Sequence, residues 1–92
     1  MTNASLRCWI YKVDRHDDVY LYLARESGFA VVPEDLMRTL GTPQLVMELC
    51  LSAERRLARE DVIQVMHNLR SRGYHLQLPP SLRPRFYAAE GG

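Results

Sequence analysis

The stretch that decides the fold is LRCWIYKVDRHDDVYLYLA, residues 6–24, in which two apolar runs flank a polar segment. Residues 6–13 and 19–24 are rich in β-branched and aromatic side chains, which favour strands. The polar residues 14–18 between them are typical of a turn. The pattern therefore predicts a β-hairpin, on which the rest of the chain must pack.

Side chains on a strand alternate between two faces, so the two faces of the predicted hairpin differ in composition. One phase is aliphatic and carries Cys8, Ile10, Val19, Leu21 and Leu23. The other phase is aromatic and carries Trp9, Tyr11, Tyr20 and Tyr22. We expect the aliphatic phase to face the core. The aromatic phase forms either a second buried face or an exposed surface for binding.

A short helix and a third strand are predicted after the hairpin. The helix lies within residues 32–40, with Pro33 at its start and Gly41 as a left-handed cap at its end. Pro43 prevents the helix from continuing. Residues 44–51 are largely apolar and predict the third strand.

The strongest helical pattern covers residues 60–72, and Gly73 follows as its cap. Residues 74–78 alternate apolar and polar side chains, which predicts a half-buried strand. Two prolines at 79–80 terminate that strand. One face of the predicted helix is apolar, at positions i, i+3, i+4 and i+7: Val62, Val65, Met66 and Leu69.

The expected architecture is a single α/β domain of the α+β type, in the order strand, strand, helix, strand, helix, strand. It has one small mixed or antiparallel sheet packed with two or more helices, because the helix before the last strand leaves a parallel pair open. We expect an N-terminal extension at 1–5, the domain at 6–80 and a flexible C-terminal tail at 81–92.

Composition excludes several classes of protein. The chain has 92 residues, 47% of them hydrophobic, and a formal net charge of +1. The apolar content is too high for a disordered chain, and the apolar runs are too short for a membrane span. The near-neutral charge argues against a generic polyanion binder, so no DNA partner and no membrane are expected. No secretory signal precedes the first predicted strand, so we expect a cytoplasmic protein.

The two cysteines, Cys8 and Cys50, are too few for a disulfide scaffold and form no Cys-x-x-Cys motif. We expect both to be small buried side chains with reduced thiols. A disulfide or redox pair is the alternative.

Five ordered segments carry a family resemblance: Ile10-Tyr11-Lys12, Tyr20-Leu21-Tyr22, Val32-Pro33-Glu34 with Leu36, Gly41 with Pro43-Gln44, and Gly73-Tyr74-His75-Leu76-Gln77-Leu78-Pro79-Pro80. In this order they resemble the YcgL family of small bacterial proteins, and the resemblance covers about residues 6–80. The resemblance implies a compact α/β sandwich. It implies no catalytic residues, because none is assigned in the family.

Motifs for chemistry are weak. His16, Asp17 and Asp18, with Asp14 nearby, fall in the predicted hairpin turn and lack the ligand spacing of a zinc site. We interpret them as a solvated turn and expect no metal and no cofactor. His67 and His75 are expected to be surface or hydrogen-bonded residues. A small enzyme of unknown reaction remains a third hypothesis, because a histidine could pair with a cysteine.

The leading hypothesis is a non-catalytic interaction or accessory module that binds a protein partner. Its candidate surface is the aromatic face of the hairpin with its margin: Tyr11, Lys12, Tyr20, Tyr22 and Gln77. The second hypothesis is a weak RNA-associated protein. It would add the arginines before the long helix, Arg55 and Arg56, because guanidinium groups hold phosphates while aromatic rings stack on bases.

Overall fold

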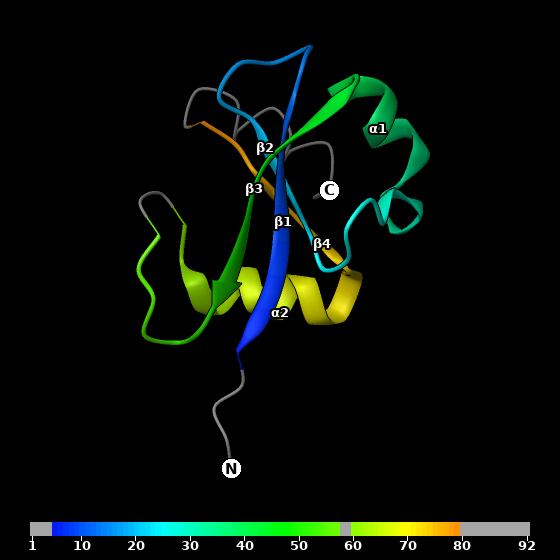
Figure 1. The fold of residues 1–92 in the computed structure, drawn as a ribbon. Coiled ribbons are helices and arrows are strands. Elements are labelled where there is room, and N and C mark those ends of the chain that lie inside the picture. The colour runs from blue at the N-terminus through cyan, green and yellow to red at the C-terminus, as the bar shows by residue number, and fades with distance from the viewer. Residues whose placement is uncertain (1–4, 58–59, 80–92) are drawn as a thin grey trace, which may run out of the picture.

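A computed structural model describes residues 5–57 and 60–79 and shows a sheet with helices on both faces (Figure 1). The elements are β1 (Leu6–Val13), β2 (Tyr20–Leu23), the 3-10 helix η1 (Phe29–Val31), α1 (Glu34–Leu40), β3 (Pro43–Leu51), α2 (Val62–Arg72) and β4 (Tyr74–Gln77). The predicted order of strands and helices is confirmed. The short helix η1 lies between β2 and α1, where no element was predicted.

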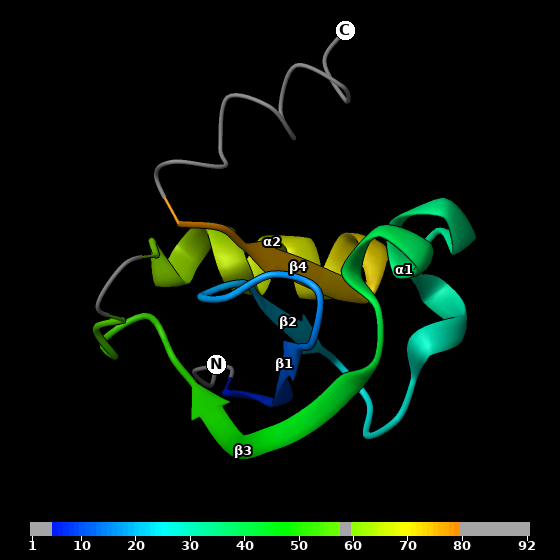
Figure 2. The same cartoon turned by 90° about the horizontal axis from the view of Figure 1, so that it is seen from above.

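The sheet is antiparallel throughout, with strand order β3-β1-β2-β4. The open alternative of a parallel pair is therefore wrong for the described strands. A parallel pair would have required β3 and β4, which are connected through α2, to lie side by side. They lie instead at opposite edges of the sheet and do not pair. Figure 2 shows β3 at one margin of a curved sheet and β4 with α2 at the other.

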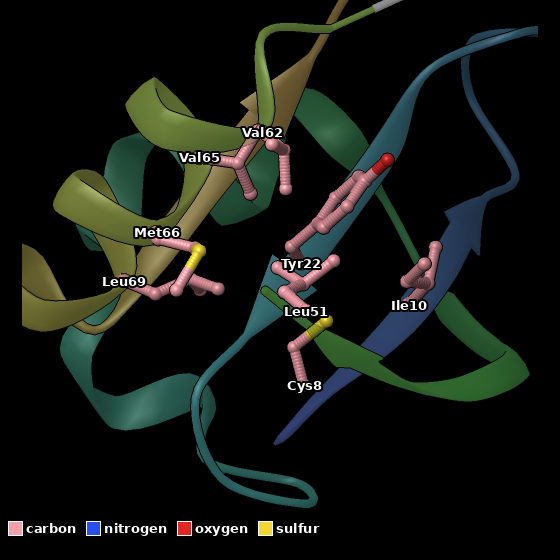
Figure 3. Close-up of a cluster of buried hydrophobic side chains, with 8 residues drawn as sticks. All are labelled: Cys8, Ile10, Tyr22, Leu51, Val62, Val65, Met66 and Leu69. Carbon is pink, nitrogen blue, oxygen red and sulfur yellow. The ribbon is translucent and has the colours of Figure 1, made fainter. Parts of the chain in front are cut away.

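Helix α2 packs on one face of the sheet, as its apolar spacing predicts. Asp61 caps its N-terminus by accepting a hydrogen bond from the Ile63 amide, and Gly73 ends it in the left-handed conformation at φ 87°. A Cβ at Gly73 would also lie only 3.0 Å from Val31. The cluster between α2 and the sheet is shown in Figure 3 and contains Cys8, Ile10, Tyr22, Leu51, Val62, Val65, Met66 and Leu69.

The opposite face of the sheet is covered by η1 and α1. Leu36 and Met37 of α1 pack against Tyr11, Leu21 and Leu23, and fully burying such a side chain contributes about 1.5–3 kcal/mol. Gly41 ends α1 at φ 89° and ψ −144°. That is a positive φ but not the left-handed helical conformation that the sequence predicted, and a Cβ there would collide with the Asp14 carboxylate.

The pairing of β1 with β3 contains a β-bulge. Ile10 lies opposite Met47, whereas the next residue, Tyr11, lies opposite Leu45. Val46 is therefore the extra residue on β3. A bulge bends its strand and re-aims the side chains around it, and this one lies in the middle of an edge strand.

The predicted tail at 81–92 and residues 1–4 of the predicted extension lie outside the described residues. Within the part of the chain that is described, no helix has the length and apolar character needed to cross a membrane.

Candidate functional site

The aromatic side chains of the hairpin do not share one face, so the prediction of an aromatic face is wrong. Ile10 lies opposite Tyr22, and Tyr11 lies opposite Leu21. Residues directly opposite each other in an antiparallel pair point to the same face. Tyr20 and Tyr22 therefore face α2 together with Ile10, whereas Tyr11 faces α1. The pairing of β1 with β2 is shifted by one residue from the expected register. A shift of one residue moves every side chain of one strand to the other face of the sheet.

Two of the predicted contact residues, Tyr11 and Tyr22, are each only 5% exposed. The Tyr11 hydroxyl accepts a hydrogen bond from the Ser27 amide at 2.8 Å, and its ring meets Phe29 edge-on. The Tyr22 hydroxyl donates to Gln77 Oε1 at 2.7 Å. Burial, followed by the negative charge of Glu60, raises the pKa of Tyr22 to about 12. Both phenols are thus parts of the packed interior.

A hollow remains on the α2 side of the sheet, and we call it the open groove. Its volume is about 350 Å³, in the range of small-ligand pockets. It draws residues from all four strands, from the hairpin turn and from the segment before α2. The lining residues are Ile10, Asp18, Tyr20, Tyr22, Val46, Met47, Leu57 and Gln77.

One wall of the open groove belongs to β3, which is nine residues long and lies at the edge of the sheet. Three consecutive apolar side chains on β3 are about half exposed: Leu45 at 46%, Val46 at 45% and Met47 at 48%. An edge strand presents backbone N–H and C=O groups that no neighbouring strand pairs. The bulge turns both Val46 and Met47 toward the open groove. Among residues 5–57 and 60–79 no strand pairs with the outer side of β3, so a bare edge and an apolar hollow adjoin each other.

The remaining predicted site residues lie at the margin of this region or outside it. Lys12 is exposed and lies opposite Tyr20 in the register, but it does not line the open groove. Arg55 and Arg56 are exposed in the segment that leads from β3 to α2, directly before Leu57. Of the seven predicted residues, the open groove brings together Tyr20, Tyr22 and Gln77.

Sequence reasoning missed five lining residues, which come from β1, the hairpin turn, β3 and the segment before α2: Ile10, Asp18, Val46, Met47 and Leu57. One signal was available, because Leu45-Val46-Met47 is an apolar run without alternation. Such a run breaks the two-residue period of a half-buried strand. The bulge that explains it has no sequence signature here.

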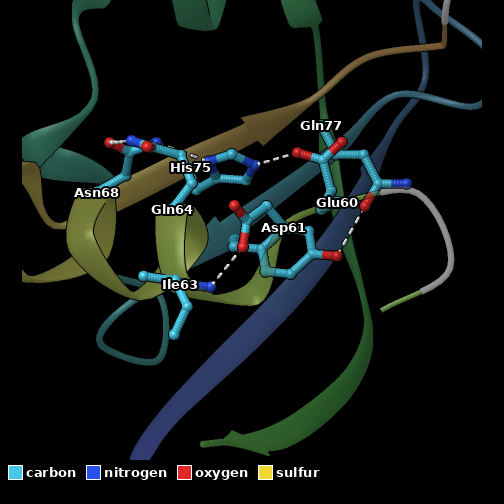
Figure 4. Close-up of polar contacts among 8 residues, drawn as sticks. Glu60, Asp61, Ile63, Gln64, Asn68, His75 and Gln77 are labelled. Carbon is cyan, nitrogen blue, oxygen red and sulfur yellow. Dashed lines mark hydrogen bonds and ion pairs between the residues drawn. The ribbon is translucent and has the colours of Figure 1, made fainter. Parts of the chain in front are cut away.

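A buried polar cluster joins α2 to β4 and does not line the open groove (Figure 4). Asn68 accepts from Gln64 at 3.2 Å, so its amide nitrogen faces His75 Nδ1 at 2.9 Å. His75 Nδ1 then accepts, and His75 Nε2 donates to Glu60 Oε1 at 2.6 Å. His75 is only 6% exposed. The expectation of a hydrogen-bonded histidine is confirmed, and the geometry gives His75 a structural role.

The two cysteines differ in their surroundings. Cys8 is fully buried against α2, and burial, followed by the nearby Cys50, raises the pKa of its thiol to about 11. It is therefore a poor nucleophile at neutral pH. Cys50 is exposed, so the prediction that both cysteines are buried is wrong for this residue. Cys50 lies opposite Arg7, on the face of β3 away from Cys8.

The fold and the open groove define a small α+β protein with a bare edge strand, and comparison with known proteins supplies the family. The YcgL domain matches residues 8–80. The chain is 51% identical over 73 residues to a YcgL domain-containing protein of Azotobacter vinelandii, covering 79% of this chain and 75% of the relative. It is 45% identical over 75 residues to one of Thioalkalivibrio sulfidiphilus, covering 82% and 93%. The chain belongs to the YcgL family.

Proposed function

We propose that this protein is a non-catalytic interaction module that binds an extended polypeptide segment along the outer edge of β3. The observation that carries the proposal is the run of half-exposed apolar residues at Leu45–Met47 on that edge. Adding a strand to an exposed edge is a common mode of peptide recognition. The backbone of the segment supplies the affinity, and every second side chain is available for a neighbouring pocket.

The open groove supports this proposal because it lies within reach of a strand added to β3. Val46 and Met47 belong both to the edge and to the wall of the open groove. Side chains of an added strand would alternate between the two faces of the sheet. Those that point to the α2 side would enter the hollow, so that a backbone contact and a side-chain contact occur together.

We also propose that the protein is located in the cytoplasm. Both cysteines are free thiols, and Cys50 is exposed on β3. An exposed free thiol suits a reducing compartment, where disulfides are rare.

The RNA hypothesis finds less support. Stacking of bases requires exposed ring faces, whereas Tyr11 and Tyr22 are buried and hydrogen-bonded through their hydroxyl groups. Arg55 and Arg56 are exposed and could contact phosphates. Of the three predicted tyrosines, however, only the half-buried Tyr20 would be left to stack on a base.

The proposal is tested with the full chain immobilised and challenged with a display library of random nine-residue peptides. Recovered peptides are resynthesised, and amide hydrogen exchange of the complex is measured. A peptide that adds a strand is expected to slow exchange of β3 amides and leave β4 amides unchanged, because only β3 gains a backbone partner.

Val46→Asp is the test variant, because a charge on the edge opposes pairing with an apolar segment. Ile63→Asp is the matched control, since Ile63 is 55% exposed on α2 and does not line the open groove. We expect Val46→Asp to weaken binding at least tenfold and Ile63→Asp to leave it unchanged. A library that yields no binder above the Val46→Asp background, or binders that leave β3 exchange unchanged, overturns the proposal.

A further inference from the structure

We infer that the open groove selects a lysine or arginine side chain in the segment that adds to β3. This inference rests on the proposed function and adds the chemistry of the partner. It follows from three properties of the lining: apolar walls, one carboxylate and an aromatic ring.

The walls of the open groove suit a long unbranched side chain. Ile10, Val46, Met47 and Leu57 supply aliphatic surface. Lysine and arginine carry three or four methylene groups that pack along such surface while the charged head reaches a polar site. A short acidic side chain would leave the walls unfilled and bring a second negative charge.

Among the described residues that line the open groove, Asp18 is the only one with a charged side chain. It sits in the hairpin turn, with its backbone held in the left-handed region at φ 63°. Within residues 5–57 and 60–79, none of the side-chain hydrogen bonds or ion pairs involves Asp18. Asp14 of the same turn, in contrast, accepts from the Thr42 amide at 2.7 Å. The turn therefore uses one carboxylate for structure and leaves Asp18 available.

Tyr20 adds a second attraction for a cation. Its half-buried ring lines the open groove together with Asp18, and a cation near an aromatic face is favoured. Lys12 lies opposite Tyr20 but outside the lining, and no ion pair joins it to Asp18 in the described chain. The charge that the described lining presents to a ligand is thus the negative charge of Asp18.

The test uses three pools of nine-residue peptides, random except for a fixed central residue that is arginine, its neutral analogue citrulline, or glutamate. Binding of each pool to the full chain is measured by affinity capture with equal input. A partly exposed ion pair with a cation–π contact predicts a preference of about three- to tenfold for arginine over citrulline, and the glutamate pool is expected to bind least.

Asp18→Asn removes the charge and keeps a residue that tolerates a positive φ. Asp17→Asn is the matched control, because Asp17 is the exposed neighbouring carboxylate and does not line the open groove. We expect the arginine preference to fall to about onefold in Asp18→Asn, by loss of the ion pair, and to persist in Asp17→Asn. Raising the salt concentration should weaken the preference in the unmodified chain.

The outcomes separate this inference from the proposed function. If all three pools bind equally while β3 amides are protected from exchange, the selection of a cation is overturned and strand addition stands. If no pool binds, the proposed function is overturned as well. If light scattering shows a dimer that Val46→Asp disrupts and peptides do not displace, a second copy occupies the edge, and the basic-peptide assignment is overturned.

Discussion

The two edge strands of the sheet are covered to very different degrees. β4 is four residues long, and its first two residues, Tyr74 and His75, are buried. Leu78 follows at 1% exposure. β3 is nine residues long, and residues 44–48 are all exposed. Short covered edges protect a sheet against unwanted pairing, whereas a long apolar edge invites it. The short, covered β4 is what the stability of the fold requires of an edge strand. The length and the exposed apolar side chains of β3 do not follow from stability.

The polar contacts of the two edges differ in the same way. At β4, the His75–Glu60 pair joins side chains that are each 8% exposed. At β3, the Arg7–Glu48 pair joins side chains that are 62% and 49% exposed. Buried hydrogen bonds are costly to break, while exposed ion pairs contribute little. The polar contacts at β4 therefore contribute more to the stability of the fold than those at β3. Matched substitutions at the two edges test this difference.

The largest difference is expected for the same truncation made at both edges. Leu78→Ala removes a fully buried side chain next to β4 and should lower the free energy of unfolding by about 2–5 kcal/mol. Leu45→Ala on β3 should lower it by about 1 kcal/mol or less, because that side chain is 46% exposed. Urea denaturation followed by circular dichroism measures both. Equal losses at the two positions would contradict the comparison.

A second prediction concerns alkaline pH, through the phenol that ties β2 to β4. The pKa of Tyr22 is raised from 10.0 to about 12. Above pH 10 the unfolded chain loses this proton while the folded protein keeps it, so the free energy of unfolding falls as pH rises from 10 to 12. A shift of two units corresponds to a loss of about 3 kcal/mol at most. Below pH 10 this group should contribute no pH dependence.

Tyr22→Phe isolates the contribution of Tyr22 to the alkaline loss. Cys8, with its thiol pKa raised from 9.0 to about 11, adds its own loss between pH 9 and 11 in both proteins. We expect the variant to start less stable, because Gln77 loses its hydrogen-bond partner, and to show a shallower decline between pH 10 and 12. Urea midpoints measured from pH 7 to 12 provide the test. Identical slopes above pH 10 would show that Tyr22 titrates normally.

A third and smaller difference is expected for the polar contacts. Asn68→Ala removes the partner of His75 Nδ1 inside the protein, and it should cost about 1–3 kcal/mol. Arg7→Ala breaks an exposed pair at β3 and should cost about 0.2–1 kcal/mol. Both values follow from denaturant midpoints at neutral pH. A larger loss for Arg7→Ala would mean that the β3 edge contributes to stability more than its exposure indicates.

The fold was predictable where local pattern and tertiary packing agree. The apolar spacing of Val62, Val65, Met66 and Leu69 identified the face of α2 that is buried. Gly73 and the paired prolines placed the ends of α2 and β4 to within one or two residues. Each of these signals is contained in a few neighbouring residues, so no knowledge of distant contacts was needed.

The candidate site was only partly predictable, because it depends on pairing between distant residues. The face on which Tyr22 lies is set by its register with Ile10, and a turn without a strong two-residue signature does not specify that register. The bulge at Val46 depends on how β1 pairs with β3. Tyr20 and Gln77 were predicted, but their neighbours in the open groove come from segments that only the folded sheet brings together.

The smallest effect on stability is expected for a charge placed on the bare edge itself. Met47 is 48% exposed, so Met47→Lys should change the free energy of unfolding by about 0.5 kcal/mol or less. It should, however, reduce self-association at high protein concentration, because lysine on an edge strand opposes pairing with another edge. Light scattering over a concentration series measures this association. Ile63→Lys is the control, since Ile63 is exposed on α2 and not on an edge. If both variants reduce association equally, general surface charge accounts for the effect. A reduction confined to Met47→Lys identifies β3 as the edge through which copies of this chain associate at high concentration, and a peptide that binds this edge is expected to displace that contact.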